Sequence, residues 1–216
     1  MTNKPLIIFD LDGTLNQTEL HSVPAQTQVL REFGVSNISP EKIKGTFGAT
    51  YEEYTETLLP GYSEERKQAY LKRVLEVESE FLLQFGNFYP GTDTMLDDLH
   101  HKGYFTAVCS NASEKYITTV LKALSLTERI DYIQPLIRGK SKKDSLRFLL
   151  SRIQPSASVM VGDTVFDMEA ARSNGIPFAG CLYGYRPYEM QGADALLRQP
   201  MDLLAVVDRL LAMNRK

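Results

Sequence analysis

A short apolar run that ends on two carboxylates constrains the fold of this chain more than any other stretch of its sequence. Residues 6–9 (Leu-Ile-Ile-Phe) are uninterruptedly apolar, as in a strand covered on both faces of a sheet. Asp10 and Asp12 follow it, and Gly13 then allows the backbone to turn sharply. Because ligands bind beyond the carboxyl ends of strands in an α/β sheet, we predict that both carboxylates stand at the rim of a site.

The second half of the chain alternates strand-like apolar runs with amphipathic helical runs. After the turn at residues 89–91, helices are predicted at 92–101, 113–124, 143–153, 166–174 and 201–213, and strands at 104–109, 130–133, 158–161, 177–182 and 193–197. Such alternation is typical of a parallel sheet covered on both faces. The predicted fold class is therefore α/β, with a Rossmann-like three-layer core and a mostly parallel sheet.

A helical block interrupts this alternation directly after the first strand. Helices are predicted at 21–33 and 51–59, with a helix start at 39–41 and a long amphipathic helix from residue 63 onward. On that long helix, we assign Leu75 to the apolar stripe and Lys67 to the solvated face. The sequence thus predicts an α/β core domain of residues 1–15 and 86–216 and a small all-helical domain of residues 16–85.

Composition argues against several classes of partner. The formal net charge of −3 disfavours a surface for nucleic acid, and no apolar run approaches the roughly 18 residues that would span a membrane. Cys109 and Cys181 lie far apart within apolar runs, which favours reduced, buried thiols in a cytoplasmic protein. A monomer or small homo-oligomer without nucleic-acid or membrane partners is expected.

Polar residues with useful chemistry also mark other predicted elements. They are Ser110-Asn111 after one strand, Gly139-Lys140-Ser141-Lys142-Lys143-Asp144 at a helix start, and Gly162-Asp163-Thr164-Val165-Phe166-Asp167 after another strand. Together with Asp-x-Asp-Gly-Thr-Leu at residues 10–15, and in this order, they resemble the four motifs of the haloacid dehalogenase-like hydrolase superfamily, whose members are mostly phosphatases. The helical block is similar to the family's first class of cap, and the branch that the chain resembles is that of the phosphoglycolate phosphatases.

The resemblance implies roles for the two carboxylates after the first strand. Asp10 would be the nucleophile that forms an aspartyl-phosphate, which water then hydrolyses. Asp12 would be the general acid that protonates the leaving alkoxide and the base that later activates water. Phosphatases and phosphomutases of the family keep this second Asp, whereas its dehalogenase and phosphonatase branches lack it.

The same resemblance implies a phosphate-binding set and a lysine. Ser110, Asn111 and Thr14 are expected to bind the substrate's phosphate with neutral donors. Lys142 is preferred as the lysine that pairs with Asp10, because the prolines of the family's Gly-Lys-Pro-x-Pro-Asp version, which would point to Lys140, are missing. Residues 140–143 leave that assignment open, with Lys143 as a third candidate.

A Mg²⁺ site is implied by the fourth motif. Asp163 would complete it with Asp10 and the backbone carbonyl of Asp12, while Asp167 would orient the site or help to hold the lysine. The predicted function is a Mg²⁺-dependent phosphatase acting on a small phosphorylated metabolite. A β-phosphoglucomutase-like phosphosugar mutase is the alternative, and a non-catalytic regulatory binding module is the weaker one.

Overall fold

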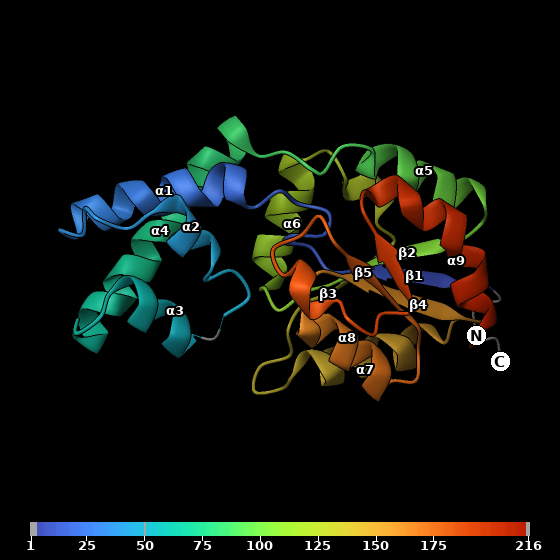
Figure 1. Cartoon of the computed structure of the whole chain (residues 1–216). Helices are drawn as coiled ribbons and strands as arrows, with labels where there is room; N and C mark the ends of the chain where they lie inside the picture. The colour runs from blue at the N-terminus through green and yellow to red at the C-terminus, as the bar shows by residue number, and fades with distance from the viewer. Residues whose placement is uncertain (1–3, 50, 215–216) are drawn as a thin grey trace. The chain divides into compact units, whose positions relative to one another are not determined.

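The computed structural model describes residues 4–49 and 51–214, in which the chain divides into two compact units. One unit runs up to Asn16 and resumes at Phe88, and the other is Gln17–Asn87. The domain boundaries expected after residues 15 and 85 lie close to these two crossings. The first unit is a sheet flanked by helices, and the second consists of helices and their connections (Figure 1).

The first unit is built on a sheet that, in the described residues, has six parallel strands. They are β1 (Leu6–Phe9), β2 (Phe105–Cys109), β3 (Tyr132–Gln134), β4 (Ser158–Gly162), β5 (Phe178–Cys181) and β6 (Ala195–Leu197). Their order across the sheet is β3-β2-β1-β4-β5-β6, which places the first strand of the chain in the middle. The predicted α/β class with a mostly parallel sheet is confirmed.

Helices cover both faces of this sheet (Figure 1). They are α5 (Thr92–His101), α6 (Glu114–Ala123), α7 (Lys142–Ile153), α8 (Val165–Ser173) and α9 (Leu203–Ala212), with 3₁₀ turns at Thr127–Arg129, Pro187–Glu189 and Pro200–Asp202. Helices α7 and α8 pack on the face to which Leu6 and Ile8 contribute, and α5 packs with α9 on the opposite face. Because both faces are buried, β1 is apolar throughout, which is the origin of the uninterrupted run at residues 6–9.

Because β1 lies between β2 and β4, polar residues from distant parts of the chain come close together beyond the ends of these three strands. The last residue of β1 is in register with residues near the ends of β2 and β4. Because the three strands run parallel, the residues that follow them emerge at one edge of the sheet. Asp10, Ser110 and Asp163 all lie at this carboxyl edge.

The described part of the second unit contains the helices α1 (Glu19–Glu32), α2 (Pro40–Lys44), α3 (Tyr51–Leu58) and α4 (Glu64–Phe85). Helices α1 and α4 pack along each other around an apolar core that includes Val29 and Val74. Two expectations for α4 were wrong. Leu75 is 59% exposed, whereas Lys67 is buried and pairs with Glu56. The buried face follows positions 67, 70, 74 and 77, at spacings of three and four residues, which leaves position 75 outside it.

Candidate active site

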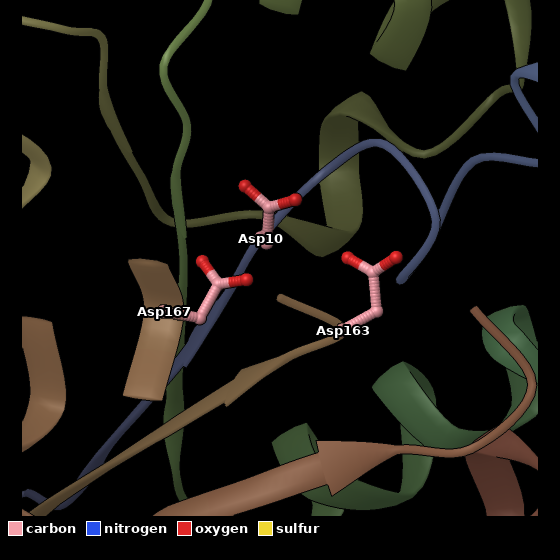
Figure 2. Close-up of side chains that lie close together, drawn as sticks. All are labelled: Asp10, Asp163 and Asp167. Carbon is pink, nitrogen blue, oxygen red and sulfur yellow. The ribbon is translucent and has the colours of Figure 1, made fainter. Parts of the chain in front are cut away.

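Three buried carboxylates from three segments meet at the carboxyl edge of the sheet. Asp10 follows β1, Asp163 follows β4, and Asp167 lies in the first turn of α8. One carboxylate oxygen of each lies within 4.8 Å of those of the other two. Figure 2 shows the three side chains brought together from these separate segments. Anions removed from water in this way must be compensated by positive charge.

Lys142 supplies part of that compensation. Its ammonium group contacts the carboxylate of Asp10 and lies 2.5 Å from Oδ1 of Asp167. Lys142 is the first residue of α7, and that helix start is held by a hydrogen bond that the hydroxyl of Ser141 donates to Asp144 at 2.7 Å. The cap orients the first turn of the helix, so the lysine side chain reaches the carboxylates from a defined position.

The other two candidate lysines lie elsewhere. Lys140 is exposed in the loop before α7. The ammonium group of Lys143 pairs with Glu169 at 3.0 Å, and both side chains are more than two-fifths exposed. Among the three candidates, Lys142 is the one that contacts Asp10, and its catalytic role stays a prediction.

Asp167 connects the lysine to the start of α8. Its Oδ2 accepts hydrogen bonds from the backbone N–H of Thr164 at 3.1 Å and from the hydroxyl of Thr164 at 2.8 Å. Its other oxygen contacts Lys142. Asp167 thus bridges Lys142 and the start of α8, and its predicted role at the site stays a prediction.

Burial raises the pKa of two of the three carboxyl groups. At Asp10 burial is the largest cause, and the pKa rises from 3.8 to about 7 although Lys142 opposes the rise. At Asp163 burial, followed by the charges of Asp10 and Asp167, raises the pKa well above its usual range. Burial opposes the charge of Lys142, but Asp10 and Asp167 outweigh it and raise the pKa of the lysine. One lysine therefore does not balance three acids.

The donor set fits a divalent cation. Oδ1 of Asp163 is buried and has no hydrogen-bond partner among the residues that the structure describes. Mg²⁺ prefers carboxylate and carbonyl oxygens and keeps several waters in its shell. A dication at this place would favour the ionised forms of Asp10 and Asp163, whose pKa values are raised without it.

A loop without a role in the sequence prediction holds Asp163 from another side. The backbone N–H of Tyr185 donates a hydrogen bond to Oδ2 of Asp163 at 2.8 Å. A Cβ added at Gly184 would stand 2.2 Å from the Cβ of Asp163, and one added at Gly13 would stand 2.3 Å from its Oδ2. Both glycines therefore let the backbone approach the carboxylate closely. In the sequence, Gly184 stands between two tyrosines directly after the strand predicted at 177–182. A glycine at such a place is a signal of close backbone approach, and it could have indicated the contact with Asp163.

Replacing Gly184 by Ala is expected to destabilise the protein by about 1–3 kcal/mol, as measured by denaturant unfolding. The reason is steric, because the new methyl group would also stand 2.6 Å from the carbonyl oxygen of Gly13. Gly45→Ala is the matched control, since its added Cβ meets its nearest atom at an ordinary 3.4 Å. Equal stability of the two variants would contradict the close approach at Asp163.

The remaining predicted site residues lie near the same edge in different environments. Oδ1 of Asp12 accepts hydrogen bonds from the side chains of Asn16 and Tyr116. Ser110 is buried and its Oγ accepts a hydrogen bond from the N–H of Ala112 at 3.1 Å, which leaves the hydroxyl able to donate its own proton. Asn111 is exposed.

Thr14 is fully buried, and its carbonyl oxygen accepts a hydrogen bond from the hydroxyl of Tyr183 at 3.1 Å. This contact ties the turn after Asp12 to the loop that also carries Gly184. The role of Thr14 in binding substrate stays a prediction, as do the roles of Ser110 and Asn111.

An α/β protein with clustered carboxylates and a paired lysine at the carboxyl edge of its sheet has the groups of an enzyme that acts on a charged substrate. The family model of the haloacid dehalogenase-like hydrolases matches residues 7–181, and the chain belongs to this family. It is 31% identical over 204 residues to a phosphoglycolate phosphatase from Vibrio vulnificus, and the match covers 83% of this chain and 84% of that relative. It is 29% identical over 209 residues to a phosphoglycolate phosphatase from Aquifex aeolicus, covering 94% and 96%. The predicted family and its class, a phosphoric monoester hydrolase, are confirmed.

Solved structures share the fold over almost the whole chain. A predicted phosphoglycolate phosphatase from Haemophilus somnus has a TM-score of 0.86 at 21% identity and covers 96% of this chain and 99% of that chain. A haloacid dehalogenase-like family hydrolase from Streptococcus pneumoniae has a TM-score of 0.83 at 22% identity, covering 96% and 100%. At these identities the likeness establishes the fold, and it confirms the predicted haloacid dehalogenase-like architecture.

Proposed function

We propose that this chain is a Mg²⁺-dependent phosphatase that hydrolyses a small phosphorylated metabolite through an aspartyl-phosphate, with 2-phosphoglycolate as the first candidate substrate. The observation that carries the proposal is the contact of Lys142 with both Asp10 and Asp167, beside the buried Asp163. The substrate candidate comes from the relatives named phosphoglycolate phosphatase, at 29% and 31% identity.

In the proposed reaction Asp10 attacks phosphorus, and the bond between phosphorus and the leaving oxygen breaks. Asp12 donates its proton to the leaving alkoxide, which departs as an alcohol. Asp12, now ionised, takes a proton from a water molecule, and the resulting hydroxide attacks the phosphorus of the aspartyl-phosphate. Inorganic phosphate leaves, and Asp10 is regenerated as a carboxylate.

The other residues of the site would offset the negative charges of the Asp10 carboxylate and the substrate's phosphate. Lys142 contacts Asp10 and would also reach a phosphate oxygen during transfer. Ser110 and Asn111 would donate hydrogen bonds to the remaining phosphate oxygens. Asp10, Asp163 and the carbonyl of Asp12 would hold a Mg²⁺ ion, which supplies Lewis-acid polarisation of the phosphoryl group.

The two units are proposed to divide the work. The core would carry the chemistry, and the helical unit, residues 17–87, would act as a cap that selects the leaving group.

The net charge of −3 favours a small-molecule partner over nucleic acid. Within residues 4–49 and 51–214, no helix combines the length and apolar character needed to cross a bilayer. A cytoplasmic monomer or small homo-oligomer is part of the proposal.

The direct test is phosphate release from a panel of phosphorylated metabolites that includes 2-phosphoglycolate and hexose 1-phosphates. We expect free phosphate from a short carboxylated or sugar phosphate, with chelation of Mg²⁺ stopping the reaction. Conversion of a hexose 1-phosphate to a hexose 6-phosphate without free phosphate would instead establish a mutase. Undiminished turnover in excess chelator would contradict the metal-dependent mechanism.

Mg²⁺ is expected to stabilise the folded protein by an amount that grows with the logarithm of its concentration, reaching about 2.7 kcal/mol at a hundredfold excess over the dissociation constant. The physical reason is that the ion offsets the repulsion among three buried carboxylates. Thermal unfolding with and without MgCl₂ measures the effect, and Asp163→Asn should abolish most of it. Equal Mg²⁺ stabilisation of wild type and this variant would exclude Asp163 as a ligand.

A further inference from the structure

Helix α6 places a tyrosine hydroxyl on the carboxylate that is proposed as the general acid. The hydroxyl of Tyr116 donates a hydrogen bond to Oδ1 of Asp12 at 3.0 Å, between residues 104 positions apart in the chain. The side-chain amide of Asn16 donates to the same oxygen at 2.9 Å. Asp12 and Tyr116 are half-buried, and Asn16 is buried. Two donors therefore converge on one of the two oxygens of this carboxylate.

Two hydrogen bonds on one oxygen restrict how the Asp12 carboxylate can turn. Both bonds are kept only while the side chain holds its orientation, so together they favour one rotamer. A general acid transfers its proton efficiently when it is held in a constant position relative to the leaving oxygen.

The local structure couples this tyrosine to the phosphate-binding loop. Tyr116 is in the first turn of α6, and its backbone N–H donates to the side chain of the N-cap Ser113 at 3.3 Å. The preceding loop is folded by the hydrogen bond from Ala112 to the hydroxyl of Ser110. Seven consecutive residues, 110–116, thus carry a proposed phosphate ligand at one end and the hydroxyl that contacts Asp12 at the other.

We propose that Tyr116 is a positioning residue for proton transfer to the leaving group: with Asn16 it holds the carboxylate of Asp12 in the orientation from which Asp12 donates the proton. This inference rests on the proposed function. It predicts a dependence on the leaving group, because an alkoxide needs protonation as it departs, whereas 4-nitrophenolate leaves readily without it. A tyrosine that merely tied α6 to the core would affect both kinds of substrate alike.

The test compares Tyr116→Phe with wild type on an alkyl phosphate and on 4-nitrophenyl phosphate, using kcat/KM, which includes departure of the leaving group. We expect kcat/KM to fall about tenfold or more for the alkyl ester, a part of the 10²–10⁴ that general acids contribute, and to stay near wild type for the nitrophenyl ester. Tyr104→Phe is the matched control, because it removes a tyrosine hydroxyl that contacts Asp208 away from the site. That variant should match wild type on both substrates.

The outcomes distinguish a failure of the Tyr116 role from a failure of the proposed phosphatase function. Equal losses on the two esters, or none, in a folded Tyr116→Phe protein would overturn the positioning role while leaving phosphatase activity established. A wild-type protein that hydrolyses neither ester would remove the proposed function and the inference with it. If Tyr116→Phe does not fold, Asn16→Ala removes the other donor to the same oxygen and should give the same selective loss; an unselective effect there would also overturn the inference.

Discussion

Replacing Asp10 by Asn is expected to lower kcat for 4-nitrophenyl phosphate by on the order of 10⁴-fold or more, as loss of a nucleophile does in enzymes with covalent intermediates. The amide has neither the charge nor the nucleophilicity to attack phosphorus. Asp10 directly follows β1, whereas the neighbouring carboxylates of Asp163 and Asp167 come from other segments, so neither is expected to replace it in the same position. Steady-state kinetics measures the loss, and acid-quench trapping of an acyl-phosphate should succeed for wild type alone.

The stability of the Asp10→Asn variant as a function of pH shows whether the variant is folded and whether the pKa of Asp10 is raised. Burial raises the pKa of Asp10 from 3.8 to about 7, so the folded, metal-free protein holds a proton there that the unfolded chain has released. Stability contributed by this group is therefore lost as the pH rises from about 4 to about 7. Metal-free Asp10→Asn should lack that loss and become more stable than wild type over this window. Near-normal turnover by a folded Asp10→Asn protein would overturn the nucleophile assignment.

Replacing Lys142 by Met is expected to lower kcat by about 10²–10³-fold, the range typical for loss of one preorganised electrostatic contact in an active site. The methionine keeps most of the side-chain volume but leaves the carboxylates of Asp10 and Asp167 without their ammonium partner. Those two groups would then repel both each other and the incoming phosphate. Steady-state kinetics at saturating Mg²⁺ measures the effect.

Lys140→Met is the matched control for that prediction. It makes the same chemical change two residues earlier in the chain, at an exposed position in the loop before α7. Its activity should equal that of wild type. If Lys140→Met were inactive and Lys142→Met active, Lys140 would have to be assigned as the lysine that assists phosphoryl transfer.

Much of the site was predictable because its signals are local. An apolar strand followed by carboxylates or by Ser-Asn places those groups at the carboxyl edge of a parallel sheet, whatever the remainder of the chain does. Asp10, Ser110 and Asp163 each carry such a signal within a few residues. The helical periodicity of residues 16–85 was equally local, although the exposure of Leu75 and the burial of Lys67 depended on how the helix is rotated in its packing.

The lysine was a harder case. Lys140, Lys142 and Lys143 lie within four residues, and charge and spacing do not separate them. The choice depends on where helix α7 begins. The cap at Ser141 makes Lys142 its first residue, and the packing of α7 on the sheet turns that residue toward Asp10. A shift of one residue in the helix start would have presented a different side chain.

By itself, the sequence determined the class of fold, the buried first strand, the order of the four motifs and the acids at the sheet edge, because each depends on side-chain polarity and on its pattern along the chain. Only the tertiary structure decided which lysine meets Asp10, that Gly184 and Tyr185 hold Asp163, and that Tyr116 binds Asp12. Those contacts join residues from 21 to 132 positions apart. Their physical cause is the packing of loops and helices at one edge of a sheet, and a short segment of the chain does not specify which distant residue it will meet there.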